Sequence, residues 1–186
     1  GHARIPLLTG MQPQGHSRHP WVRSAALWLA LALPGWSQAQ ELTEYSVKAV
    51  LYYRLAQFVY WPPDKQPPKP MQLCVVGKSP FGNALEQVDK SSGNAQFQVT
   101  PSEISNCQMI FIPRSESGNL TSWLERASSR QLVTVSDIPG FARAGGMIEL
   151  PLEGERVNIV INPRSAQKQG FEFNAQLLRL ARVVEP

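Results

Sequence analysis

The two cysteines of this 186-residue chain, Cys74 and Cys107, are the residues whose chemistry is easiest to specify. Each lies in a short apolar segment, QLCVVGK (72–78) and NCQMIFIP (106–113), and each segment is typical of a buried strand. Thiols in neighbouring strands can form a disulfide, which would close a long loop and stabilise the fold. The alternative is two separate buried thiols, each acting as a small hydrophobic residue.

The cellular compartment of the protein bears on the choice between a disulfide and two free thiols, because disulfides persist in oxidising surroundings. After the first methionine, Met11, basic residues precede the apolar run AALWLALAL (25–33), and Ser37-Gln38-Ala39 supplies small residues at a signal-peptidase site. This pattern predicts a secretory signal peptide that is cleaved after Ala39, and the run is too short to remain as a membrane span. The alternatives are an N-terminal anchor or a buried helix.

Cleavage would change the composition of the protein. Residues 1–39, which include ten residues upstream of Met11, hold all three histidines, three of the 18 basic residues and none of the 14 acidic ones. The net charge of +4 therefore belongs largely to the leader, and nucleic-acid binding loses its support. We expect residues 40–186 to form a single exported domain, a length that suits one hydrophobic core.

Catalytic and cofactor motifs are weak in residues 40–186. Without histidine this part of the chain cannot build a Ser-His-Asp or Cys-His site, and it lacks the commonest transition-metal ligand. Gly77-Lys78-Ser79 lacks the earlier glycine of a phosphate-binding P-loop, and Ser165-Ala-Gln-Lys168 lacks the companion motifs of a serine acyl-transfer enzyme. Scattered carboxylates could still form a catalytic pair. We expect no enzyme activity, no metal and no cofactor.

Helices and strands alternate along the chain. Apolar residues at helical spacing predict a first helix over 42–60, which must stop before Pro62, and a proline-rich connector follows over 62–70. Further helices are predicted over 80–90, 118–129, from Pro163 to Gly170, and over 175–184, with Asn162 and Asn174 as N-caps. Strands are predicted over 72–76, 96–100, 108–112, 131–136, 147–150 and 156–161, the last two joined by a turn at 153–155.

This alternation predicts an α/β fold: a single three-layer domain with a mostly parallel central sheet of about six strands and helices on both faces. In the common 2-1-3 strand order, the strands that hold Cys74 and Cys107 are neighbours. We therefore expect these two cysteines to form a disulfide in the exported protein.

Several segments, taken together, resemble the YfiR family. They are KAVLYYRLAQFVYWP (48–62), LCVVGKSPFGNAL (73–85), CQMIFI (107–112), LVTVSD (132–137), GGMIEL (145–150), VNIVINPRSAQKQG (157–170) and LLRLARVV (177–184). The resemblance implies a small periplasmic α/β protein without known catalysis, whose best-understood relatives bind the periplasmic region of an inner-membrane diguanylate cyclase, YfiN, and repress it. The expected outcome is less cyclic dimeric GMP and less biofilm. Relatives can depend on a disulfide for folding, and Cys74 and Cys107 match such a pair.

An interaction protein needs a surface patch, and two are candidates for the cyclase contact. The first is Tyr60 and Trp61 beside the proline connector, since amphipathic aromatics are good interface anchors. The second is Arg179 and Arg182 on the last helix, which could meet a partner carboxylate. The alternatives are a core-capping role for Trp61 and a solvated face for the arginines.

A second possible function is a periplasmic small-molecule-binding domain that feeds a membrane sensor. The protein could also form a homodimer.

Overall fold

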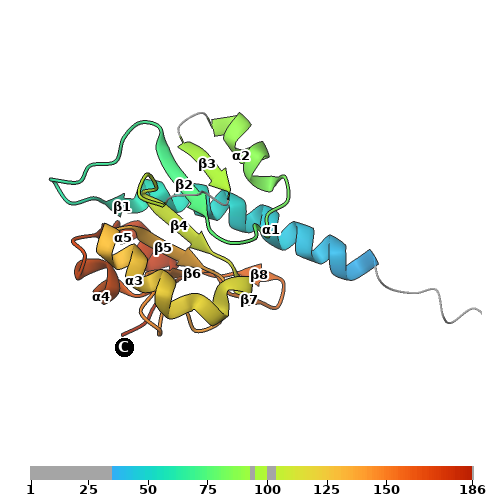
Figure 1. The fold of residues 1–186 in the computed structure, drawn as a ribbon. Helices are drawn as coiled ribbons and strands as arrows, with labels where there is room; N and C mark the ends of the chain where they lie inside the picture. The colour runs from blue at the N-terminus through green and yellow to red at the C-terminus, as the bar shows by residue number, and fades with distance from the viewer. Residues whose placement is uncertain (1–34, 93–94, 100–103, 186) are drawn as a thin grey trace, which may run out of the picture. The chain divides into compact units, whose positions relative to one another are not determined.

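A seven-stranded, mostly parallel sheet organises the structure (Figure 1). The computed structural model describes residues 35–92, 95–99 and 104–185. The helices and 3-10 helices are α1 (Gly35–Leu55), η2 (Ala56–Phe58), α2 (Ala84–Ser92), η3 (Arg114–Asn119), α3 (Leu120–Arg130), α4 (Pro163–Gln167) and α5 (Ala175–Leu180). The strands are β1 (Val59–Tyr60), β2 (Met71–Val75), β3 (Ala95–Val99), β4 (Met109–Ile112), β5 (Val133–Ser136), β6 (Ile148–Glu149), β7 (Leu152–Glu153), β8 (Arg156–Val157), β9 (Val160–Ile161), β10 (Glu172–Phe173) and β11 (Arg182–Val183).

The order of the strands in the sheet is β11-β9-β6-β5-β4-β2-β3. Strands β3, β2, β4, β5 and β6 are parallel, whereas β9 is antiparallel to β6 and parallel to β11. The predicted α/β class is confirmed, with seven strands in the sheet where about six were expected. Strand β2 lies between β3 and β4, which is the 2-1-3 order predicted for the strands that carry the cysteines.

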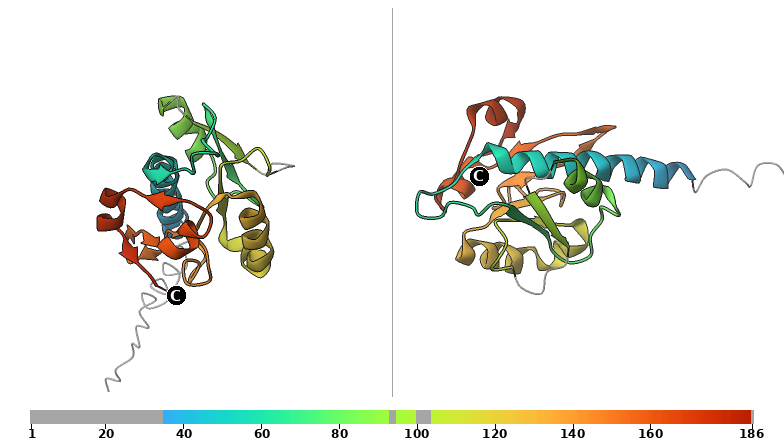
Figure 2. Two further views of the ribbon diagram at one scale, coloured as in Figure 1. Left: turned by 90° about the vertical axis from the view of Figure 1, so that its left-hand side faces the viewer. Right: turned by 90° about the horizontal axis from the view of Figure 1, so that it is seen from above.

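Successive side chains of the central strands point to opposite faces of the sheet, so the fold has two cores. In β2, Leu73 and Val75 pack with the α1 side chains Tyr45 and Tyr52. Cys74 instead packs in a second core with residues of α3. Helices α1 and α3 therefore cover opposite faces of the sheet (Figure 2).

Helix α1 differs from its prediction at both ends. It begins at Gly35 and ends at Leu55, where the expected helix ran from 42 to 60, and η2 and β1 continue the chain toward Pro62. The predicted cleavage site after Ala39 falls within α1, and most of the predicted leader, 1–39, lies outside the described residues. None of the helices that the structure describes has the length and apolar character to cross a membrane.

The C-terminal quarter contains both confirmed caps and an error of prediction. Asn162 and Asn174 accept hydrogen bonds from the backbone N–H groups of Ser165 (3.1 Å) and Gln176 (2.8 Å), as N-caps do. The last helix, however, ends at Leu180, and the chain then becomes strand β11 beside β9. The prediction of a helix to 184 was wrong, because pairing with the sheet replaces the last helical turn.

Candidate functional site

The two cysteines are joined in the structure. Cys74 and Cys107 form a disulfide with a Cα–Cα distance of 5.9 Å, and both residues are buried. The carbonyl oxygen of Cys74 also accepts a hydrogen bond from the hydroxyl of Tyr52 in α1, at 2.8 Å. Burial raises the pKa of Tyr52, so this phenol stays protonated and remains a donor. Strand β2 is therefore tied to α1 by a hydrogen bond and to the segment before β4 by the disulfide.

A second set of polar residues meets where parallel strands β4 and β5 end. Arg114 follows β4 after one proline, and Asp137 is the residue directly after β5. Helix α1 supplies Glu44, Tyr45 and Lys48 from its buried stripe. The carboxyl ends of parallel strands lie at one edge of a sheet, which brings Arg114 and Asp137 together. The three α1 residues pack against them there, and we call this group of five residues the edge cluster.

The edge cluster is centred on Asp137. One carboxylate oxygen of Asp137, Oδ2, accepts from the Tyr45 hydroxyl at 2.6 Å, from Lys48 Nζ at 2.9 Å and from Arg114 Nε at 3.1 Å. Glu44 completes the group by pairing with both Lys48 and Arg114. Two carboxylates thus face two cations, and the cluster is electrically balanced.

Most of the edge cluster is buried, which strengthens its ion pairs and hydrogen bonds. The side chains of Lys48 and Asp137 are fully buried, Glu44 is 8% exposed, and Arg114 alone reaches solvent, with 47% of its side chain exposed. Burial, followed by the hydrogen bond and charge of Asp137, raises the pKa of Tyr45 well above its ordinary range, so Tyr45 stays a neutral donor. Burial opposes the charge of Arg114, but Asp137 and Glu44 together raise its pKa. The cluster therefore fixes α1 to the ends of β4 and β5.

A cleft opens beside the edge cluster, between the N-terminal half of α1 and the hairpin of β7 and β8. We call it the carboxyl-edge cleft. It measures about 950 Å³, and its walls include Gln40, Thr43, Glu44 and Val47 of α1 and Leu152, Arg156 and Val157 of the hairpin. An adjoining hollow of about 400 Å³ shares Gln40, Glu44 and Leu152 with it and reaches Tyr45 and Arg114. Ligands of open α/β sheets commonly bind at this edge.

The chemistry of this site suits binding. Lys48 and Asp137 are sealed from solvent, and three donors occupy one oxygen of Asp137, so neither residue is placed to exchange a proton with a substrate. Within the described residues, no three or more histidine, cysteine, aspartate or glutamate side chains are grouped so as to hold a metal ion. The cleft offers apolar surface from Val47, Leu152 and Val157 and the exposed side chain of Arg156, and the adjoining hollow offers the half-exposed guanidinium of Arg114.

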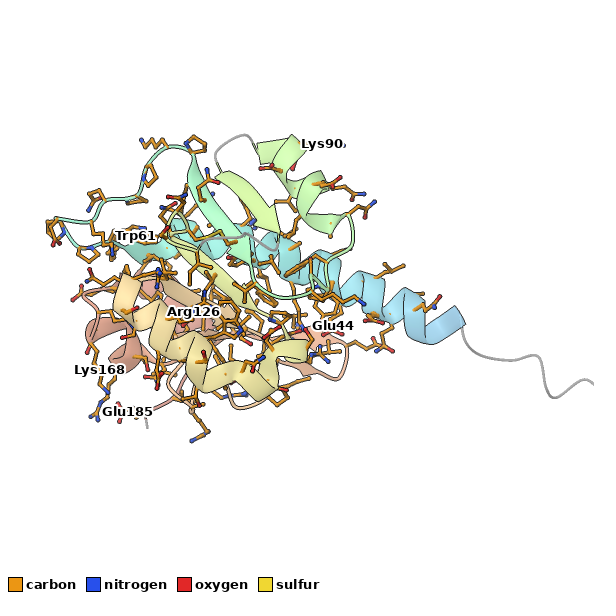
Figure 3. The ribbon with its side chains drawn as sticks, viewed as in Figure 1. Glu44, Trp61, Lys90, Arg126, Lys168 and Glu185 are labelled. Atoms are coloured by element: carbon orange, nitrogen blue, oxygen red, sulfur yellow. A yellow bond between two sulfur atoms is a disulfide. The ribbon has the colours of Figure 1, made fainter. Side chains whose placement is uncertain are left out.

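Tyr60 and Trp61, predicted for partner binding, follow the C-terminal end of α1, and Figure 3 shows Trp61 well away from Glu44, which lies near the middle of that helix. Tyr60 is 56% exposed, and its hydroxyl accepts a hydrogen bond from the Asn174 side chain at 2.9 Å. Trp61 is half-buried and meets the ring of Phe171 edge-on at 5.2 Å. Both residues line a hollow of about 310 Å³ against the Gly170–Glu172 segment. Their role in partner binding stays a prediction.

Arg179 and Arg182 are exposed but do not share a helix. Arg179 lies in the last turn of α5, whereas Arg182 begins β11 and pairs with Glu153 of β7 at 2.8 Å. Hydrogen bonds from Arg182 and Asn158 lower the pKa of Glu153, so this carboxylate stays charged. The expected two-arginine helical surface is therefore absent, because the helix ends before Arg182. A role for either arginine in binding a partner is still untested.

The edge cluster was not predicted, although the sequence carried a partial signal for it. Glu44 and Lys48 are four residues apart on the stripe of α1 that also holds the buried Tyr45, Ala49 and Tyr52. Charged residues within an apolar stripe need buried partners. Nothing in the local sequence points to Arg114 and Asp137 as those partners, since 66 or more residues separate them from Lys48 along the chain.

Comparison with protein families identifies a family for this chain. The model of a family described as YfiR/HmsC-like matches residues 45–182, which is most of the chain. No curated protein matches the sequence significantly.

Solved structures share the fold at low sequence identity. A conserved domain protein from Vibrio cholerae O1 biovar eltor superposes with a TM-score of 0.55 at 9% identity. An ABC domain from Streptococcus pneumonia, solved in complex with L-Trp, superposes with a TM-score of 0.50 at 13% identity. Each comparison covers 76% of this chain, which spans only 60% of the length of either structure. These likenesses support the α/β fold alone.

Proposed function

The chain belongs to the YfiR/HmsC-like family, and from this we propose that it is a periplasmic regulatory protein that binds the periplasmic region of an inner-membrane diguanylate cyclase and represses it. The family match over residues 45–182 is the observation that carries the proposal. Repression of the cyclase lowers cyclic dimeric GMP and limits biofilm formation.

The structure supports a role in binding. The edge cluster and the Tyr52–Cys74 hydrogen bond fix α1 on the sheet, and the disulfide fixes β2 to the segment before β4. A rigid surface loses little conformational entropy when it meets a partner, so more of the contact energy appears as affinity. The absence of histidine from residues 40–186 fits the same role, because a repressor of this kind needs no general base.

Export to the periplasm is part of the proposal. The signal peptide is cleaved after Ala39, and the mature protein begins at Gln40 as one domain, 40–186. This start lies in α1, four residues ahead of Glu44, so processing shortens the helix by residues 35–39 and leaves the α1 residues of the edge cluster in place.

Deletion of the gene tests the proposed function. Cyclic dimeric GMP is expected to rise in the deletion strain and to fall again when the protein is expressed with its leader, but not when it is confined to the cytoplasm. Mass spectrometry of nucleotide extracts measures this. An unchanged nucleotide level in cells that express the cognate cyclase would exclude the repressor role.

Substitution of Trp61 tests whether Tyr60 and Trp61 form part of the interface with the cyclase. If Trp61 is a central anchor, Trp61→Ala should weaken cyclase binding by about 2 kcal/mol or more, which is roughly thirtyfold in Kd. Calorimetry with the purified periplasmic region of the cyclase measures the change. Because Trp61 also packs against Phe171, thermal unfolding must first establish that the variant folds. Tyr60→Ala is the matched variant, since Tyr60 is mostly exposed; full affinity in both variants would remove this patch from the interface.

A second candidate function is a small-molecule-binding domain that feeds a membrane sensor. The carboxyl-edge cleft favours it, because about 950 Å³ lies within the usual range for ligand sites. Native mass spectrometry of the periplasmic protein should then detect a retained ligand.

A further inference from the structure

We propose that the carboxyl-edge cleft is where the cyclase docks, through an apolar segment whose acidic side chain pairs with the exposed edge of Arg114. This inference rests on the proposed function and names the surface and the chemistry of the contact. It concerns residues 39–47 of α1, whereas Tyr60 and Trp61 follow the C-terminal end of the helix.

The first reason is the unused hydrogen-bonding capacity of Arg114. Its Nε donates to Asp137 and its Nη2 pairs with Glu44, while Nη1 makes no hydrogen bond to the described residues. Nearly half of this side chain is open to solvent. A partner that covered Arg114 without supplying an acceptor would bury unpaired N–H donors, and each unsatisfied group would weaken binding. A carboxylate satisfies these donors best, since charge-assisted and bidentate pairs with arginine are the strongest.

The second reason is the character of α1 around the cleft. Leu42 and Val47 are 67% and 43% exposed, so this part of the helix presents unusually apolar surface to solvent. Val47 also lines the cleft, opposite Leu152 and Val157 of the hairpin. An apolar partner side chain that enters here gains burial on both sides, which favours a protein segment over a fully polar ligand.

The exposed charges at the rim of the cleft contribute less to the affinity for a partner than Arg114 does. The cleft has an exposed acidic residue, Glu155, and an exposed basic one, Arg156, and the adjoining hollow has the exposed Glu41. Exposed rim charges are screened and contribute little to affinity. On the proposed cleavage, the α-amino group of Gln40 adds a positive charge at the mouth of the cleft, since an α-amino pKa lies near 8. The positive end of the α1 helix dipole then lies there as well, and it offsets part of the repulsion that Glu41 and Glu155 exert on an acidic partner.

A change of charge at Val47 tests both parts of the proposal. Val47→Glu should weaken binding of the purified cyclase periplasmic region at least tenfold, because it places a carboxylate beside the partner's carboxylate. Val47→Lys should retain affinity within about threefold, because its charge is complementary. Val50→Glu is the matched control on the same helix, outside the cleft walls, and should bind as the unchanged protein does. Calorimetry measures Kd, and thermal unfolding verifies that all three variants fold.

Each outcome separates the proposals. If the unchanged protein fails to bind the cyclase region, the proposed function is wrong. If it binds and Val47→Glu binds equally well, the cleft is not the docking surface. If Val47→Lys loses as much affinity as Val47→Glu, the partner segment is not acidic, and the Arg114 pairing is overturned.

Discussion

Lys48→Met is expected to lower the free energy of unfolding by about 3–5 kcal/mol, the usual cost of breaking a buried ion pair by removing one partner. Lys48 is fully buried and neutralises both Glu44 and Asp137. In the variant, Arg114 alone would face two buried carboxylates, and it reaches them from the solvent side. The apolar stem of methionine preserves most of the packing of lysine, so the loss reports the missing charge.

Urea unfolding followed by circular dichroism measures this loss. Lys78→Met is the matched control, since Lys78 is exposed, and it should change stability by no more than about 0.5 kcal/mol. Adding Glu44→Gln to Lys48→Met removes one uncompensated carboxylate and should restore part of the stability. A Lys48→Met variant within 1 kcal/mol of the unchanged protein would contradict a stabilising role for the edge cluster.

Removal of the disulfide is expected to cause the second large loss of stability. The Cys74–Cys107 bond closes a loop of 33 residues, and its loss is expected to cost about 4 kcal/mol in the chain-entropy description. Both sulfur atoms are buried in the α3 core, so Cys74→Ala also removes packed volume. We expect lower periplasmic abundance of this variant, because unfolded molecules are degraded.

The double variant, Cys74→Ala with Cys107→Ala, separates the bond from the packing. Adding reductant should destabilise the unchanged protein by about as much as the double substitution does, and the double variant should not respond to reductant. Denaturant unfolding with and without dithiothreitol provides the comparison. If both thiols react with an alkylating reagent in the folded, non-reduced protein, the bond is absent and the prediction is wrong.

The sequence predicted the main sheet because the relevant signals are local. Short apolar runs bounded by turn residues mark β2, β4 and β5, and helices between them require parallel pairing. The caps at Asn162 and Asn174 were predictable for the same reason, since a cap depends on residues adjacent in the chain. Order 2-1-3 then follows as the common solution for such a sheet, and it brings Cys74 close enough to Cys107 to bond.

Elements that depend on distant pairing were not predicted. Strand β1 exists because Val59 and Tyr60 pair with Phe173 and Glu172. Strand β11 exists because Arg182 and Val183 pair with β9, and it ends α5 early. Two-residue strands of this kind carry too little pattern to be distinguished from loop or helix in the sequence.

The candidate site also has a part that the sequence predicted and a part that it did not. Cys74 and Cys107 were predicted, because an apolar strand with a single thiol is conspicuous in a chain that is expected to be exported. The edge cluster was not, because Arg114 and Asp137 look like ordinary residues of strand-to-helix turns until the sheet brings them to Lys48. The carboxyl-edge cleft depends in turn on the β7–β8 hairpin, whose turn was predicted but whose position beside α1 was not.

Direct measurement of cyclase activity tests the central claim most closely. The full-length cognate cyclase can be reconstituted in nanodiscs, which expose both its periplasmic and its cytoplasmic region, and supplied with GTP. Addition of the mature protein purified from periplasm should reduce cyclic dimeric GMP synthesis to a saturable minimum, and Val47→Glu should require at least ten times more protein for the same effect. Unchanged synthesis at a saturating concentration of folded, disulfide-bonded protein would contradict the repressor function.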